Sequence, residues 1–175
     1  VVLHGARFNP DKAKWFNKEY LRKHSDESLA KDFEAILEEK GIKADFDYVV
    51  KVVSLIKERA TFVADFWDIA WYLFKAPCEY VEKDVAKFWK EENYTLAFKV
   101  ADFIAAFPGE LEKEALESAL EEYIRGNEWP MGKVMNCLRL ALVGSSSGLG
   151  IADIVCLLGK DEFERRVAAI KTALC

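Results

Sequence analysis

Arginines and one bend rich in serine and glycine are the features of this chain whose chemistry suits contact with a nucleic acid. Like every arginine, Arg59, Arg125 and Arg139 carry a planar fork of donors that matches the acceptors of base edges and phosphates, and their residue type alone does not single them out. The bend follows Gly144, and its amides lie at the start of a predicted helix, where anions bind favourably. Taken alone, each arginine is equally compatible with an ordinary surface position, and the bend with a plain connection between helices.

The same bend fits two enzyme motifs only in part. The run from Gly144 to Gly148 has the G-x-S-x-G pattern of a hydrolase nucleophile, but that motif needs a preceding strand, and residues 138–143 continue a helical pattern. No histidine follows Ser146, although that fold places one after its serine. A phosphate-binding P-loop is excluded too, because Leu149 and its successors replace the Gly-Lys-Ser/Thr ending. We therefore predict no catalytic residue.

Metal binding is not predicted either. The cysteines form no C-x-x-C pair, and only His4 and His24 are available as nitrogen ligands. The four cysteines are Cys78, Cys137, Cys156 and Cys175. The acidic residues alternate with lysines on helix faces, which is typical of solvated charge.

The net charge and the hydropathy of the chain limit the kinds of partner that it is expected to bind. The chain has 25 basic and 30 acidic residues, so its net charge of −5 argues against a general nucleic-acid coat and against DNA, while a local basic face stays possible. One such stripe is Lys14, Lys18 and Arg22. No apolar run is long enough for a bilayer and no signal peptide is present, so we expect a cytoplasmic protein. Because the first residue is Val1, we expect a piece of a longer chain.

Helical periodicity runs through nearly the whole sequence and predicts an all-α bundle of about nine or ten helices. Two helical subdomains are expected, residues 1–80 and 81–175. In the first helix, Ala13, Phe16 and Tyr20 are predicted to face inward. The expected helices cover about 10–23, 26–41, 47–57, 61–74, 81–90, 93–107, 111–125, 131–143, 151–158 and 161–174. The fourth carries an aromatic tract whose Phe62, Phe66 and Ala70 are predicted to form a core face.

Four segments resemble, in the same order, the C-terminal anticodon-binding region of bacterial glutamyl-tRNA synthetases, which are class I aminoacyl-tRNA synthetases. Residues 8–21 resemble the helix after the catalytic part, and residues 53–74 resemble a segment with an arginine before an aromatic run. Residues 138–144 (Leu-Arg-Leu-Ala-Leu-Val-Gly) and 157–166, which begin Leu-Leu-Gly-Lys, are similar to the ending. The chain departs from the family at Val143, where a threonine is usual, and in the bend, where Thr-Pro-Gly-Leu is common.

The resemblance implies specific roles. The arginine aligned with Arg59 reads the last anticodon base in members that accept only glutamate tRNA. The loop aligned with Gly148, Leu149, Gly150 and Ile151 contacts splayed anticodon bases. Arg125 and Arg139 align with arginines on the RNA-facing side, and both are equally compatible with structural roles.

The resemblance also implies what the chain does not do. The catalytic HIGH and KMSKS signatures are absent, so ATP and Mg would belong to the parent ligase, and this part is expected to need no cofactor. The implied partner is the anticodon stem-loop of glutamate tRNA, bound by a monomer. The alternative from another class is a helical scaffold that binds proteins, which the acidic charge and abundant aromatics also allow.

Overall fold

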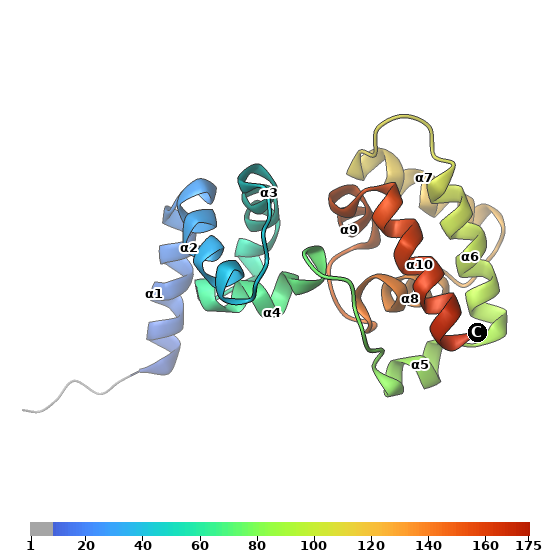
Figure 1. The fold of residues 1–175 in the computed structure, drawn as a ribbon, viewed down its shortest axis with the longest axis horizontal. Helices are drawn as coiled ribbons and strands as arrows, with labels where there is room; N and C mark the ends of the chain where they lie inside the picture. Colours follow the sequence, from blue (N-terminus) through green and yellow to red (C-terminus); the bar gives the residue numbers. More distant parts are fainter. Residues whose placement is uncertain (1–8) are drawn as a thin grey trace, which may run out of the picture. The chain divides into compact units, whose positions relative to one another are not determined.

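The chain is built from helices. The computed structural model describes residues 9–175, and in that range it contains ten α-helices, three short 3-10 helices and no strand (Figure 1). The all-α prediction is therefore confirmed. Residues 1–8, which include His4 and Phe8, lie outside the described part of the chain. The fold divides into two compact units, Val1–Phe74 and Lys75–Cys175.

The first unit is a small helical cluster. Its α-helices are α1 (Pro10–Lys23), α2 (Asp26–Glu39), α3 (Phe46–Ile56) and α4 (Phe66–Ala70), and its 3-10 helices are η1 (Lys57–Arg59), η2 (Val63–Asp65) and η3 (Trp71–Leu73). Helices α2 and α3 pack against each other, and α4 packs against both. The ring of Phe33 meets those of Phe66 and Phe74 edge to face, at centroid distances of 5.4 and 5.6 Å. This aromatic cluster is the centre of the first core.

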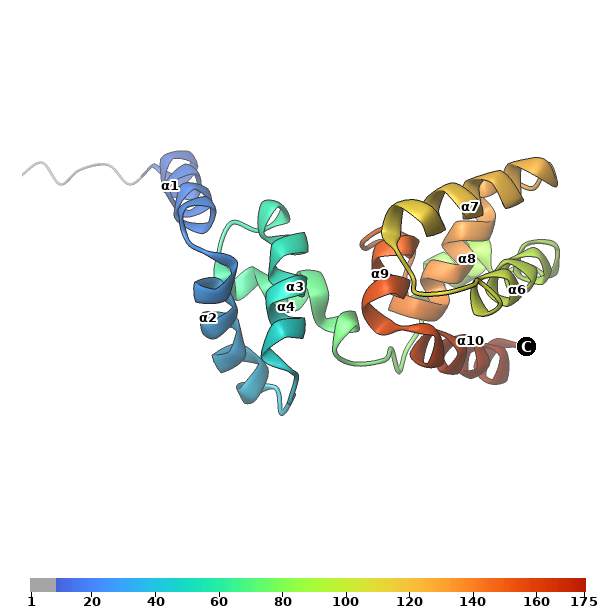
Figure 2. The same cartoon turned by 90° about the horizontal axis from the view of Figure 1, so that it is seen from above.

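The second unit is larger, and helix α8 lies at its centre (Figure 2). Its helices are α5 (Glu82–Phe88), α6 (Glu91–Ala105), α7 (Lys113–Gly126), α8 (Met131–Val143), α9 (Ile151–Leu158) and α10 (Lys160–Leu174). Helix α8 contacts each of the other five. Seven of its thirteen residues are buried, which is the pattern expected of a helix that is surrounded by other helices.

Local sequence signals fix several helix ends. The Asn9 side chain accepts hydrogen bonds from the amides of Asp11 and Lys12, and Pro10 takes the first helical position. Gly41 and Gly144 follow helix ends with φ angles of 73° and 85°, which only glycine adopts at little cost. These three boundaries agree with the sequence prediction.

Three predictions about the first unit are wrong. Phe16 and Tyr20 do not face inward: they are 56% and 48% exposed, and Leu21 is the only buried residue among those of α1. The predicted helix 61–74 is three short helices, because the Asp65 carboxylate accepts hydrogen bonds from the amides of Thr61 and Phe62 and starts a new turn. Phe62 is therefore 45% exposed and does not join the core face.

Within the described residues, no helix is long and apolar enough to cross a membrane.

Candidate nucleic-acid interface

Arg59 is the last residue of η1, directly after the end of α3, and its side chain is exposed. The neighbouring charges are paired: Lys57 Nζ lies 2.7 Å from Asp26, and Glu58 lies 3.6 Å from Arg22. Among residues 9–175, Arg59 itself pairs with no carboxylate. Its guanidinium is thus available to an external ligand.

An exposed aromatic ring follows Arg59 by three residues. Phe62 lies in an irregular turn. Asp65 Oδ2 fixes the backbone of this turn, because it accepts hydrogen bonds from the Thr61 amide at 3.0 Å and the Phe62 amide at 2.9 Å. The sequence interpretation placed this ring in the core and so missed it. The signal for its exposure was Asp65 itself, because an aspartate three residues after a helix entry can fix the backbone amides of a new turn. An exposed ring three positions after an unpaired guanidinium is suited to stacking on an unpaired base.

Arg125 lies at the exposed end of α7. Its guanidinium pairs with Glu121 one turn earlier at 3.0 Å, and the two side chains are 74% and 51% exposed. Such an exposed pair contributes about 0.3–0.5 kcal/mol to helix stability. Contact with a phosphate would therefore cost little in broken protein interactions.

Arg139 lies on α8 and is half-buried. Its Nε donates to the backbone carbonyl of Leu149 at 3.4 Å, and Nη1 donates to Asn136 Oδ1 at 3.0 Å. The guanidinium therefore links α8 to the bend, and it supports the candidate loop from the protein side.

The four loop residues divide into two kinds. Gly148 and Gly150 are exposed, whereas Leu149 and Ile151 are 1% and 2% exposed and belong to the core. Apolar contact of an RNA base with either side chain would require the loop to open. The accessible groups are the small ones, namely the glycine backbone and Ser147.

The helix that follows the bend already has a carboxylate at its first turn. Asp153 lies there with only 15% of its side chain exposed and pairs with Lys113 at 3.3 Å. Because this carboxylate already lies near the partial positive charge of the helix start, a phosphate at the same point would meet a negative charge. The exposed apex of the bend is thus a better contact point than the amides of α9.

The bend is anchored at its first residue. The carbonyl of Gly144 accepts a hydrogen bond from the Val81 amide at 2.8 Å. A Cβ placed on Gly144 would lie 2.5 Å from the Glu79 carbonyl oxygen and 3.0 Å from Pro77 Cβ. The segment before α5 therefore lies directly against the end of α8, and glycine is required for both its φ angle and its size.

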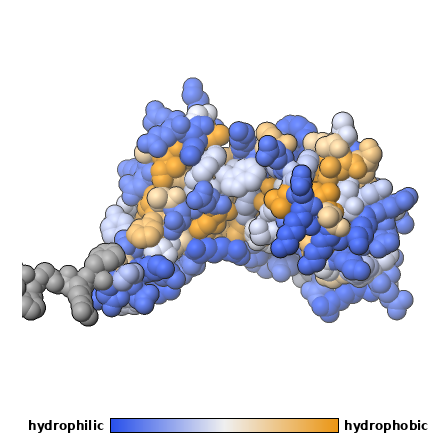
Figure 3. Space-filling view, turned by 90° about the horizontal axis from the view of Figure 1, so that it is seen from below, coloured by the Kyte–Doolittle hydropathy of each residue, from blue (hydrophilic) through white to orange (hydrophobic). Residues whose placement is uncertain are grey.

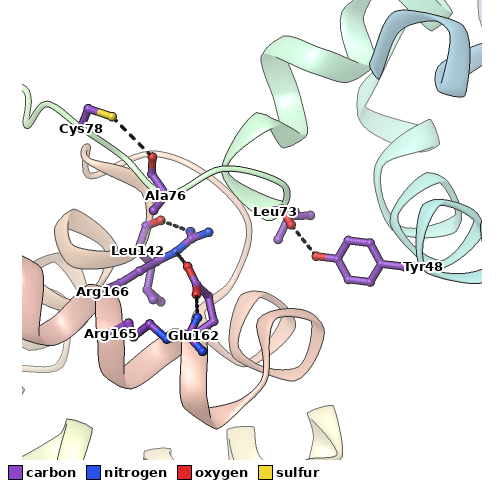
Figure 4. Close-up of polar contacts among 8 residues, drawn as sticks. All are labelled: Tyr48, Leu73, Ala76, Cys78, Leu142, Glu162, Arg165 and Arg166. Carbon is purple, nitrogen blue, oxygen red and sulfur yellow. Dashed lines mark hydrogen bonds and ion pairs between the residues drawn. The ribbon is translucent and has the colours of Figure 1, made fainter. Parts of the chain in front are cut away.

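A buried arginine supports the same helix end (Figure 4). Arg166 is 3% exposed, and its Nη1 donates to the Leu142 carbonyl at 2.7 Å while its Nε donates to Glu162 at 3.0 Å. A cation at a helix C-terminus is stabilised by the negative end of the helix dipole. Arg166 was not among the residues predicted to form the site, although its role is to hold the helix from which the bend starts.

Polar and apolar side chains alternate on the surface. The face in Figure 3 is largely hydrophilic, with separate hydrophobic patches between the charged side chains.

The candidate residues come from both units. Arg59 belongs to the first unit, while Arg125, Arg139 and the bend belong to the second. Within residues 9–175, no group of three or more His, Cys, Asp or Glu side chains is placed to hold a metal ion.

The family to which the chain belongs is shown by a match to a family model. Residues 28–171 match the family model of the anticodon binding domain, and the chain belongs to that family. The match extends across both units. It favours RNA recognition over the scaffold alternative.

Curated relatives give a more particular likeness. The chain is 42% identical over 170 residues to a glutamate–tRNA ligase of Flavobacterium johnsoniae, a match that covers 97% of this chain and 34% of that protein. A glutamate–tRNA ligase of Phocaeicola vulgatus is 40% identical, with 93% of this chain and 32% of that protein covered. The chain therefore spans about a third of the length of these relatives.

A solved structure supports the same likeness. The crystal structure of a glutamate tRNA ligase from Elizabethkingia meningosepticum, in complex with its amino acid, matches with a TM-score of 0.87 and 33% identity. That match covers 98% of this chain and 34% of the crystallised one.

Proposed function

We propose that this chain is the anticodon-recognition part of a glutamate–tRNA ligase and binds the anticodon stem-loop of glutamate tRNA as a monomer in the cytoplasm. The ATP- and Mg-dependent attachment of glutamate would be carried out by other parts of the ligase, and this part would act without a cofactor. The observation that carries the proposal is the match of residues 28–171 to the anticodon binding domain family.

Two features of the first unit support a role in reading a base. Arg59 is exposed and unpaired among the described residues, and Phe62 offers an exposed ring three positions later. A stacked base contributes about 1–3 kcal/mol of binding free energy. A wrong base that leaves a polar group unpaired costs on the order of 1–3 kcal/mol. Stacking adds affinity for any base, whereas the cost of the unpaired group is large enough to favour one anticodon base over another.

The test compares two RNAs and two arginine variants. The chain is titrated with a glutamate tRNA transcript and with a transcript altered at the last anticodon base, at one fixed salt concentration because phosphate contacts depend on salt. Arg59→Gln should reduce the preference between the RNAs more than it weakens binding overall. Arg165→Gln is the matched control, since Arg165 is also exposed and the substitution removes the same charge.

Each outcome has a defined meaning. Absence of binding to either RNA would refute the proposal as a whole. Equal affinity of the unsubstituted chain for both RNAs would refute base reading at that position. An Arg59→Gln variant that loses its fold would show that this arginine is structural.

A further inference from the structure

The bend after α8 is held by a carboxylate that is distant in sequence. Asp84 Oδ2, in the first turn of α5, accepts a hydrogen bond from the Ser146 amide at 2.9 Å, across 62 positions of sequence. A hydrogen bond to an ionised acceptor is roughly twice as strong as one between neutral groups. Asp84 therefore fixes the backbone in the middle of the bend.

Other contacts fix the rest of the bend. The Val81 amide donates to the Gly144 carbonyl at one end, and Arg139 donates to the Leu149 carbonyl at the other. Within the bend, Ser145 Oγ lies 3.2 Å from Ser147 Oγ and accepts from the Ser147 amide at 3.4 Å. The bend is therefore hydrogen-bonded at both ends and in the middle, and its Ser147 and Gly148 are exposed.

We propose that Asp84 is a positioning residue for RNA binding: it holds residues 145–148 in the conformation that the anticodon region contacts. This inference rests on the proposed function. Asp84 acts through the Ser146 amide and not by touching RNA. If the loop without this bond is in the competent conformation a tenth of the time, the apparent affinity falls about tenfold.

The charge of Asp84 and its positioning role predict opposite changes in RNA affinity when the side chain is removed. Removing a carboxylate near an RNA strengthens binding if charge is all that matters, because the repulsion of phosphates falls. Loss of loop positioning weakens binding instead. Glu82 provides the matched control, because it lies two residues earlier on the same helix and is exposed.

The experiment measures the dissociation constant for the glutamate tRNA transcript and the hydrogen-exchange rate of the Ser146 amide in the free chain. We expect Asp84→Ala to raise the dissociation constant about tenfold and to accelerate exchange of that amide. Asp84→Asn keeps a neutral acceptor, so we expect a rise of about threefold. Glu82→Ala and Glu82→Gln should bind as tightly as the unsubstituted chain or more tightly.

The contrary results are distinct from one another. Binding by Asp84→Ala that is as tight as that of Glu82→Ala overturns the positioning role. If Asp84→Ala unfolds, the pair Asp84→Asn and Glu82→Gln decides, since both lose one charge and equal affinity overturns the inference. If the unsubstituted chain binds no tRNA, the proposed function fails and the inference with it. In that case, slow exchange at Ser146 that is lost in Asp84→Ala would show that Asp84 has a structural role only.

Discussion

Gly144→Ala should destabilise the second unit by more than its backbone angle alone accounts for. The φ angle of 85° costs a non-glycine residue about 1–2 kcal/mol. The added Cβ would lie 2.5 Å from the Glu79 carbonyl oxygen, a backbone atom that must move with its segment. That movement disturbs the Val81–Gly144 hydrogen bond, which contributes about 0.5–1.5 kcal/mol. We therefore expect a total loss of about 1.5–3.5 kcal/mol in the free energy of unfolding.

The matched control is Gly109→Ala. Gly109 also lies in the second unit and has a φ angle of 76°, but a Cβ there would meet no atom within 4 Å. We expect Gly109→Ala to lower the free energy of unfolding only through its backbone angle, by about 1–2 kcal/mol. Urea unfolding followed by circular dichroism gives the free energies, and hydrogen exchange of the α8 amides reports on the second unit alone. Equal losses for the two variants would refute the argument that close contact at Gly144 matters.

Three further predictions concern single side chains. Arg166→Leu leaves the Leu142 carbonyl without its buried donor and should cost about 1–3 kcal/mol in urea unfolding, whereas the exposed Arg165→Leu should cost under 1 kcal/mol; similar losses would contradict this. Burial raises the pKa of the Cys137 thiol to about 12, so the unfolded chain loses that proton first and stability should fall as pH rises above about 9. A Cys137→Ala variant with the same fall in urea midpoint would show that other groups cause it. Phe62→Ala should weaken tRNA binding by about 1–3 kcal/mol in a titration, while substitution of another exposed ring, Phe16→Ala, should not; parallel losses would remove the proposed stacking role.

Much of the fold could be predicted because helix ends depend on local chemistry. Asn9 and Gly144 mark their boundaries through a side-chain acceptor and a left-handed backbone, and both signals are visible in sequence. Which side of helix α1 is buried could not be predicted in the same way. The spacing of Phe16 and Tyr20 indicates an apolar face but does not indicate what covers it, and in the structure both rings are exposed.

The candidate residues show a similar limit. The family resemblance could nominate Arg59 and the bend from the sequence, but not the side chains that support them. Asp84 and Arg166 reach the bend and its helix from 62 and 24 positions away, and such pairings arise only from the packing of α5 and α10 around α8. Leu149 lies in the nominated loop yet is 1% exposed, because the chain turns inward between two exposed glycines.

Each unit is anchored almost up to the boundary between them, which follows Phe74. Tyr48 donates to the Leu73 carbonyl at 2.6 Å and its ring meets that of Phe74, so the first unit is fastened up to its last residue (Figure 4). Pro77 already lies against the end of α8 at Gly144. Only Lys75 and Ala76 remain between these anchors, and the proline restricts Ala76 to extended geometry. Residues inserted between Lys75 and Ala76 would interrupt none of these anchoring contacts, so the free energy of unfolding of each unit should be unchanged.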